Sequence, residues 1–297
     1  MNVFVTGTTC RTGVGRFFIE KFSRENKYRI VCLVRKSSEI EWLKKLNTQI
    51  IYGDLNDENS LIKQMKGIEI VVNIAGIRGA LSLINAMVKA DVKKGIFVNT
   101  TGVFSKFKSA SKEYKIIEAE MIERFSRNEI KYAIIRPTMI YGNGCDNNVR
   151  KIALYLSKHT FFPIFGDGSA LIQPVYYKDV AKALVALTEN EKCWGKAYNI
   201  SGREPVTYKR FIEIIAETIG RKVKFIKLPL FPIVTSVSLL NKIIPGFPIK
   251  SEQILRTIED RAFAYTDAQE CFGYDPISFE EGIKLEIKEL RKEGYIS

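Results

Sequence analysis

The first fifteen residues constrain the fold more than any other part of the chain. Asn2–Thr6 (NVFVT) is a short apolar run typical of a buried strand, and it leads directly into the glycine-containing loop GTTCRTGVG. From Val14 onward apolar residues recur at helical spacing. Gly7 permits a tight turn after the strand, and Gly13 at the helix start permits a phosphate to approach the free N–H groups there. This order predicts a phosphate-binding loop, although an ordinary strand–helix turn is the alternative.

The rest of the first half alternates in the same way. We predict further strands at 29–34, 49–52, 69–74, 95–99 and 131–135, and helices at 14–24, 39–46, 59–65, 80–92 and 111–126. Strands that are apolar on both faces and alternate with helices indicate an α/β fold, a doubly wound parallel sheet of the Rossmann type. Ligands bind such sheets at the carboxyl ends of the strands. The first loop, the loop after the second strand, and Thr100–Phe104 should therefore line one crevice.

Prolines and shorter elements follow Arg136, which predicts a second, smaller C-terminal lobe. We expect residues 1–137 to form the dinucleotide-binding core, with 174–200 returning to it. Residues 138–173 and 201–297 should form the substrate-binding lobe.

Charge and cysteine content restrict the partners. The chain has 46 basic and 33 acidic residues, a net charge of +13, but they form no dense tract, so we expect no nucleic-acid partner. The cysteines Cys10, Cys32, Cys145, Cys193 and Cys271 are scattered, which predicts a reduced, cytoplasmic protein with isolated thiols.

The most apolar stretch, Leu228–Ile249, is interrupted by prolines. The uninterrupted run between these prolines is too short to span a bilayer, which needs about 20 residues. We predict a buried helix there, with a surface that touches a membrane or a lipid-linked substrate as the alternative.

Several motifs resemble those of one family. VTGTTCRTG resembles the VTGxxGxxG opening of extended and atypical short-chain dehydrogenases, with Cys10 at the middle glycine. Four later segments resemble successive segments of NAD(P)-dependent nucleotide-sugar epimerases, dehydratases and reductases. They are RPTMIYGNG, PIFGDGSALIQPVYYKDVAKAL, GKAYNISGREPVTYKRF and the tail DRAFAYTDAQECFGYDPISFEEGI. The resemblance covers almost the whole chain in order.

The resemblance implies a set of cofactor contacts. Arg35 and Lys36 stand where NAD enzymes carry an acid, and Arg11 lies in the first loop. Cations there suit a 2′-phosphate, so we expect NADP, with NAD as second choice. The complete predicted set is Gly7, Thr9, Cys10, Arg11, Thr12, Gly13, Arg35, Lys36, Asp54, Leu55, Ala75, Gly76 and Pro137.

The resemblance also implies catalytic positions. Thr100 matches the Ser or Thr that polarises the substrate oxygen, and Tyr114 is the candidate acid or base. The family places a Lys four residues after its Tyr, whereas this chain has Glu118. Lys106, Lys108 or Lys112 is the candidate to replace this lysine. The alternative role of Thr100 is to cap a turn at the end of a strand, and that of Tyr114 is to pack on the core.

For the substrate we expect contacts from Thr101, Met139, Arg150, Gln173 and Arg256. His159 is the only histidine, so we expect no metal site.

Together these features predict an NAD(P)-dependent oxidoreductase or epimerase (isomerase) that moves hydride to or from a nucleotide-sugar or similar carbohydrate. The alternative is an NADP(H)-binding sensor or assembly protein without turnover. We expect no stable membrane span, and a homodimer is an open alternative to a monomer.

Overall fold

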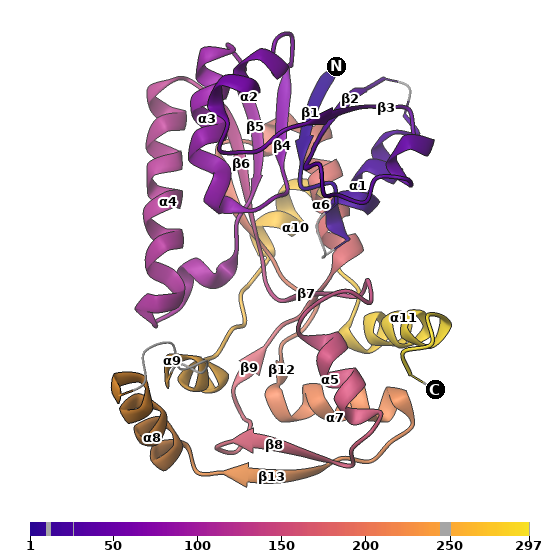
Figure 1. The fold of residues 1–297 in the computed structure, drawn as a ribbon, viewed down its shortest axis with the longest axis vertical. Helices are drawn as coiled ribbons and strands as arrows, with labels where there is room; N and C mark the ends of the chain where they lie inside the picture. Colours follow the sequence, from indigo (N-terminus) through magenta and orange to yellow (C-terminus); the bar gives the residue numbers. More distant parts are fainter. Residues whose placement is uncertain (10–12, 26, 244–250, 297) are drawn as a thin grey trace.

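The computed structural model describes residues 1–9, 13–25, 27–243 and 251–296 (Figure 1). At its centre lies a seven-stranded sheet in the order β11-β6-β5-β4-β1-β2-β3, in which every neighbouring pair is parallel. The predicted doubly wound parallel sheet is therefore confirmed. Its strands are β1 Asn2–Thr6, β2 Arg29–Val34, β3 Thr48–Tyr52, β4 Ile70–Asn73, β5 Lys94–Val98, β6 Lys131–Pro137 and β11 Lys196–Ile200.

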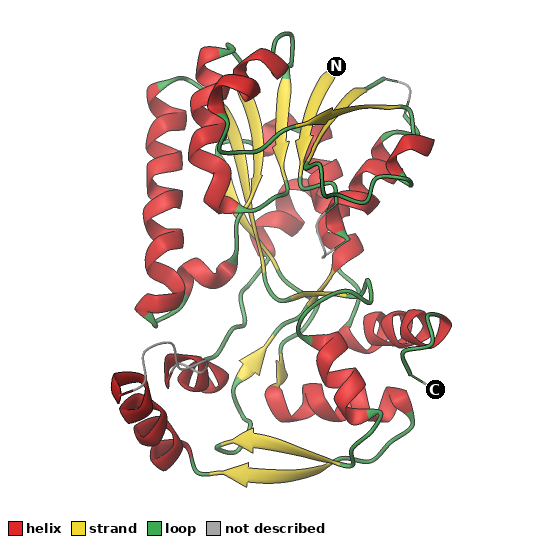
Figure 2. Cartoon of the chain, viewed as in Figure 1, coloured by secondary structure: helices red, strands yellow, loops and turns green. Residues whose placement is uncertain are grey.

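Both faces of the sheet are buried, because successive strand residues point to opposite sides. Val3 and Val5 of β1 belong to one apolar cluster and Phe4 to the other. The first cluster packs under α1 (Val14–Phe22) and α6 (Tyr177–Glu189), and the second under α2 (Glu58–Gln64), α3 (Ala80–Lys89) and α4 (Lys108–Arg127). Figure 2 shows the strands enclosed between these two layers of helices.

The predicted helix at 39–46 is wrong. The structure has only a single 3-10 turn, η1 (Leu43–Lys45), in this stretch. Ile40 and Leu43 are both buried, and residues three apart reach the same side in one such turn. The chain is already in strand β3 at Thr48, which leaves no room for a longer helix.

The second lobe lies at the carboxyl ends of the strands (Figure 1). It contains the short strands β7 (Ile140–Tyr141), β8 (Phe161–Phe165), β9 (Leu171–Ile172), β10 (Val175–Tyr176), β12 (Val206–Thr207) and β13 (Lys224–Leu228). Its helices are α5 (Val149–Leu156), α7 (Tyr208–Ile219), α8 (Leu230–Ile243), α9 (Ser251–Leu255) and α11 (Phe279–Lys292). A third apolar cluster joins α5, α7 and α11. Helix α10 (Thr266–Phe272) returns to the sheet and contacts β11 and α6.

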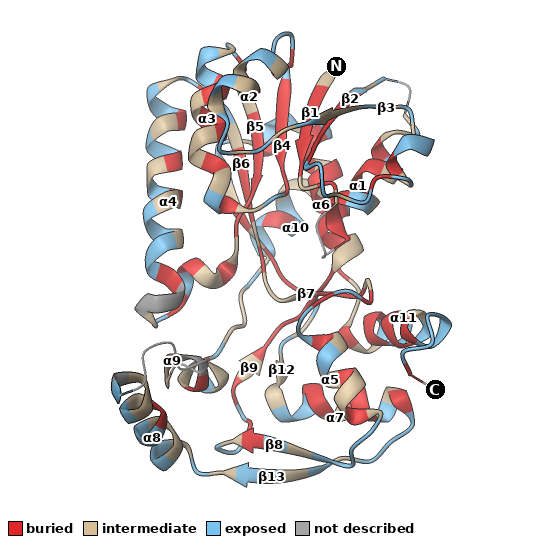
Figure 3. Ribbon diagram, viewed as in Figure 1, coloured by how far each residue is buried: buried red, intermediate tan, exposed pale blue. Residues whose placement is uncertain are grey.

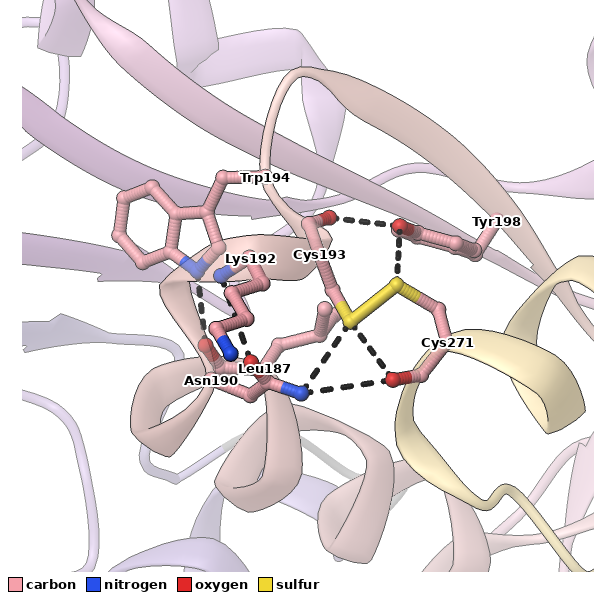
Figure 4. Close-up of a disulfide and its surroundings, with 7 residues drawn as sticks. All are labelled: Leu187, Asn190, Lys192, Cys193, Trp194, Tyr198 and Cys271. Carbon is pink, nitrogen blue, oxygen red and sulfur yellow. Dashed lines mark hydrogen bonds between the residues drawn. A yellow bond between two sulfur atoms is a disulfide. The ribbon is translucent and has the colours of Figure 1, made fainter.

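The prediction that all cysteines are isolated thiols is wrong. Cys193 and Cys271 form a disulfide with a Cα–Cα distance of 5.8 Å, and it ties α10 to the 3-10 turn η4 (Glu191–Cys193) that follows α6 (Figure 4). The two cysteines are 78 residues apart, so their spacing gives no hint of the pairing. Tyr198 donates a hydrogen bond to the carbonyl of Cys193 at 2.6 Å. Of the other described cysteines, Cys32 is buried and Cys145 is exposed.

The prediction of a buried helix in Leu228–Ile249 is also wrong. Helix α8 forms, but most of its residues are exposed or half-buried, and only Val237 among its described side chains is buried (Figure 3). The helix has apolar residues on all sides, whereas among the described residues its main packing partner is α9. Residues 244–250 lie outside the described residues. Among the described residues, no helix has the length and apolar character that crossing a membrane requires.

Candidate active site

The first loop is shaped by close backbone contacts. Gly7 has φ +73°, and a Cβ there would lie 2.4 Å from the backbone nitrogen of Ala75. A Cβ on Gly15 would lie 2.2 Å from the carbonyl oxygen of Gly7, so α1 approaches β1 more closely than a side chain would allow. Gly15 was missed in the sequence, although the spacing TGVG contains it. Gly13 has φ +74° and immediately precedes α1.

A buried network fixes the next loop. Thr6 at the end of β1 donates to the Asn73 Oδ1 at 2.6 Å, and Asn73 at the end of β4 donates through Nδ2 to the carbonyl of Gly76 at 3.0 Å. Asn73 is fully buried. The network fixes the loop of Ala75 and Gly76 at the point between β1 and β4 where the strand order reverses, which is where such sheets bind dinucleotides.

A cavity of about 370 Å³ lies over the ends of β1, β2, β3 and β4. Six of the predicted cofactor residues line it: Gly7, Thr9, Arg35, Asp54, Leu55 and Ala75. Ser38, Arg78 and Gly79, which the sequence analysis did not select, also line it. The cavity therefore brings together the first loop and the loops that follow the next three strands of the sheet.

The two cations predicted after β2, Arg35 and Lys36, lie in different places. Arg35 lines the cavity, whereas Lys36 is exposed and does not. Ser38 lies on the cavity instead and accepts a hydrogen bond from the Thr9 hydroxyl at 3.1 Å. A guanidinium and a hydroxyl at this position suit a phosphate better than a ribose hydroxyl. Arg11, predicted to act with them, lies outside the described residues with Cys10 and Thr12.

A second cavity of about 550 Å³ lies over the ends of β5 and β6. It is lined by the predicted residues Thr100, Thr101, Met139, Gln173 and Arg256. Further lining residues include Phe104, Lys106, Asn148, Glu259, Asp260, Arg261 and Phe263. Since β5 and β6 are next to β4 in the sheet, the two cavities lie along the same edge.

Thr100 has two roles in this geometry. It lines the second cavity, and its Oγ1 accepts a hydrogen bond from the Gly102 N–H at 3.0 Å, which caps the 3-10 turn η3 (Thr101–Phe104). Tyr114 approaches the same glycine: a Cβ on Gly102 would lie 3.4 Å from both Thr100 Oγ1 and Tyr114 Cδ2. Tyr114 is half-buried and does not line the cavity, and the Arg78 guanidinium lies 5.8 Å from its ring centroid.

Glu118 occupies the position that the family motif gives to lysine, and it pairs with Arg136. Its two carboxylate oxygens share the Arg136 Nε–H, at 3.0 and 3.1 Å, and accept further hydrogen bonds from Arg136 Nη2 and from the side-chain amide of Asn99. Of the lysines proposed as replacements, Lys106 lines the second cavity. Lys112 is exposed on α4 and does not line this cavity. The side chain of Lys108 is not among the side chains that the structure describes.

Two side chains attach the far wall of the second cavity to the core. Buried Glu259 accepts from the Ser105 hydroxyl at 2.9 Å and from the Lys106 N–H at 2.6 Å. Gln173 donates through Nε2 to the Gly202 carbonyl at 2.7 Å and accepts from the Phe263 N–H at 2.9 Å. The amide nitrogen and the amide oxygen of the Gln173 side chain are therefore both engaged, so Gln173 shapes the wall of the cavity.

Arg256 and Arg261 give this cavity its cationic character. The Nε of each is buried and has no hydrogen-bond partner among the described residues. Burial, followed by the neighbouring charge of Arg256, lowers the pKa of Arg261. Two guanidinium groups with unsatisfied donors form a site for an anionic group. Arg261 could not be singled out in the sequence, because nothing separates it from other surface arginines there.

The remaining predicted residues lie elsewhere. Arg150 stacks on Tyr295, with its guanidinium carbon 4.4 Å from the ring centroid, and is not part of the cavity lining. Pro137 accepts from the Thr101 hydroxyl at 3.3 Å and so supports the cavity from behind. His159 stacks against Tyr155 at 4.4 Å between ring centroids. Among the described residues, no group of His, Cys, Asp or Glu could hold a metal ion.

The fold and the two cavities define a dinucleotide-binding α/β protein. The family model for NAD(P)H-binding proteins matches residues 11–191. The chain belongs to this NAD(P)H-binding family, and its relatives are extended short-chain dehydrogenases, as the motifs predicted.

Two relatives align along most of the chain. A 3beta-hydroxysteroid-dehydrogenase/decarboxylase, isoform 2, of Arabidopsis thaliana is 26% identical over 83% of this chain and 53% of its own length. The 2-alkyl-3-oxoalkanoate reductase of Shewanella oneidensis is 24% identical over 82% of this chain and 75% of its own length. The chain thus spans about half of the Arabidopsis protein.

Solved structures show the same fold. UDP-glucose 4-epimerase from Thermotoga maritima superposes with a TM-score of 0.76 at 21% identity, with 99% of each chain covered. The dTDP-glucose 4,6-dehydratase of Bacillus anthracis gives 0.75 at 16% identity and covers 98% of this chain and 97% of its own.

Proposed function

We propose that this chain is an NADP(H)-preferring oxidoreductase or epimerase that acts on an anionic carbonyl or hydroxyl compound, in first place a nucleotide-sugar. The observation that carries the proposal is the pairing, in one cavity, of Thr100 with the unsatisfied guanidinium donors of Arg256 and Arg261. The Thr100 hydroxyl can bind the reacting oxygen of a substrate, and the two guanidinium groups can bind its diphosphate. Such separate anchoring fixes the reacting carbon against the cofactor and lowers the entropy cost of reaction.

The residues of the first cavity fit a dinucleotide. Gly7 and Ala75 both line this cavity, and a Cβ on Gly7 would collide with the backbone of Ala75, so a glycine allows the first loop to lie close against the loop after β4. Arg35 and Ser38 would bind the 2′-phosphate, and Asp54 with Leu55 would lie beside the adenine. The bound nicotinamide would supply or accept the hydride.

Proton handling falls to the second cavity. Because Thr100 Oγ1 already accepts from Gly102, its own proton can be donated to a substrate oxygen. Lys106 would contribute a positive charge that stabilises a developing alkoxide. Tyr114 would exchange the proton from behind Gly102, and it would have to turn toward the cavity to do so.

A second substrate class, 2-alkyl-3-oxo acids, also has support. The S. oneidensis relative is named for such a reaction, and Phe104, Met139 and Phe263 give the cavity apolar lining. A carboxylate would then replace the diphosphate at the arginines.

The third possibility, a dinucleotide-binding protein without turnover, draws support from Glu118, which stands in place of the motif lysine.

Steady-state oxidation of NADPH with two substrate panels tests the proposal. One panel contains 4-keto nucleotide-sugars and the other 2-alkyl-3-oxoalkanoates, and nucleotide-sugar epimerisation is followed in parallel by product analysis. We expect turnover on the first panel, with KM raised at least tenfold by Arg261→Gln. Turnover on the second panel alone would transfer the proposal to oxo acids. Tight NADPH binding without turnover on either panel would contradict an enzyme and favour the sensor.

A further inference from the structure

Helix α8 is an exposed apolar surface that the catalytic account does not use. Phe231 is 80% exposed, Ile243 64% and Leu239 57%. Exposed apolar residues scattered singly are ordinary, whereas several on one helix mark an interaction site. On this chain they lie on a helix at the outer end of the second lobe (Figure 1, Figure 3).

The apolar surface continues onto neighbouring elements. Strand β13 leads into α8 and pairs with β8, and each strand exposes a large apolar side chain, Ile226 and Phe161. At the end of β8, Gly166 donates to the carbonyl of Leu228 at 3.3 Å, and the Ile258 side chain lies next to Gly166. Ile258, also exposed, belongs to the turn η5 (Arg256–Ile258).

The charge of this region identifies the partner. Between residues 218 and 251 the chain contains no Asp or Glu, and its basic residues there are Arg221, Lys222, Lys224, Lys227, Lys242 and Lys250. The first four are exposed, and of these Lys224 and Lys227 lie on β13, the strand that leads into α8. Many basic residues on other elements form ion pairs with nearby acids. Apolar side chains beside a purely cationic stretch complement an anionic bilayer, where the former enter the headgroup boundary and the latter stay among the phosphates.

We propose that α8 and β13 bind the surface of an anionic phospholipid bilayer, so that the chain is a peripheral membrane protein. The surface is adjacent to the second cavity, because α8 packs on α9, α9 packs on η5, and η5 supplies Arg256 and Thr257 to the cavity lining. Binding would therefore bring the arginines of that cavity close to the lipid headgroups. This inference does not depend on which substrate the enzyme uses.

Cosedimentation of the whole chain with extruded vesicles tests the proposal. One set of vesicles is pure phosphatidylcholine and the other contains about 30% phosphatidylglycerol, which gives it a negative surface potential. We expect binding to the anionic vesicles that is at least tenfold tighter than to the neutral ones and that weakens at high salt. No binding to the anionic vesicles, or equal binding to both, would overturn the proposal.

Variants separate the apolar and charged contributions. Phe231→Ser with Leu239→Ser should lower the affinity for anionic vesicles at least tenfold, and Lys224→Gln with Lys227→Gln should lower the preference for them by about tenfold. The matched control is Leu285→Ser, which removes an exposed leucine from α11 and should bind like wild type. Unchanged NADPH binding and thermal midpoint show that each variant is folded.

A second copy of the chain is the competing occupant. Sedimentation velocity without vesicles is expected to show the same oligomeric state for wild type and for Phe231→Ser with Leu239→Ser. An oligomer that this double substitution dissociates would show that another copy covers α8, and it would overturn the bilayer proposal.

Discussion

Arg136, at the end of β6, pairs with Glu118 on α4 through two donors: its Nε–H lies 3.0 and 3.1 Å from the two carboxylate oxygens, and its Nη2 donates to one of them. The pair is largely buried, with 9% of the Glu118 side chain and 16% of the Arg136 side chain exposed. The position that the family motif gives to a catalytic lysine therefore serves here to fasten α4 to the sheet. Asn99, which immediately precedes Thr100, joins the same carboxylate, so the pair also positions the candidate catalytic threonine.

Arg136→Met should destabilise the fold by about 3 kcal/mol, because it leaves the carboxylate of Glu118 buried without its cation. Chemical denaturation measures this loss. The matched control is Arg127→Met, which removes an exposed partner of Glu123 on the same helix and should cost less than about 1 kcal/mol. Equal losses for both variants would refute a structural role for the buried pair.

Thr100→Ala should lower kcat about 10²- to 10⁴-fold on whichever substrate the panels reveal, since it removes the donor to the reacting oxygen. Tyr114→Phe should have a similar effect if the phenol exchanges the proton. Tyr132→Phe serves as the control, because Tyr132 packs on the same apolar cluster from β6. A Tyr114→Phe variant with full activity would leave Tyr114 as a packing residue only.

Cys271→Ser should lower stability by about 4 kcal/mol under non-reducing conditions, because the disulfide closes a long loop and restricts the unfolded chain. Thermal unfolding with and without reductant checks this. Wild type in reductant should fall to the level of the variant, whereas Cys145→Ser, at an exposed free thiol, should behave like wild type in both conditions. Two free thiols at positions 193 and 271 in the non-reduced protein would contradict the pairing.

Glu286 on α11 should make stability fall as pH rises. Burial, with help from the neighbouring Asp146, raises the pKa of Glu286 to about 10 in the folded protein, against 4.5 in the unfolded chain. Between these values the folded state holds a proton that the unfolded state has lost, so unfolding releases a proton and is favoured at higher pH.

Glu286→Gln removes this proton release and should raise the thermal midpoint more at pH 8 than at pH 5. Glu289→Gln, on the same helix but partly exposed, is the matched control for the substitution itself. A Glu286→Gln variant whose gain is the same at both pH values would show that Glu286 does not carry a proton in the folded state.

The sequence predicted what short-range patterns determine. The strands Asn2–Thr6 and Arg29–Val34 were predicted with their observed bounds, because each is a continuous apolar run closed by a turn. The lining residues Arg35 and Thr100 followed from their positions after strands. By contrast, the links between Cys193 and Cys271 and between Glu259 and Ser105 join residues 78 and 154 positions apart, which no local pattern encodes. Helix α8 was misassigned because its composition is that of a core helix, and only its position in the fold exposes it.

The most direct test of the account is a fluorescence titration of the purified chain with NADPH and NADH, in wild type, Arg35→Ala and Lys36→Ala. We expect NADPH to bind at least tenfold more tightly than NADH, because a charged hydrogen bond to the 2′-phosphate contributes about 1.5–3 kcal/mol. Arg35→Ala should abolish the preference, whereas Lys36→Ala, outside the cavity, should retain it. Tighter binding of NADH by wild type would contradict the role of Arg35, and binding of neither would contradict the dinucleotide site itself.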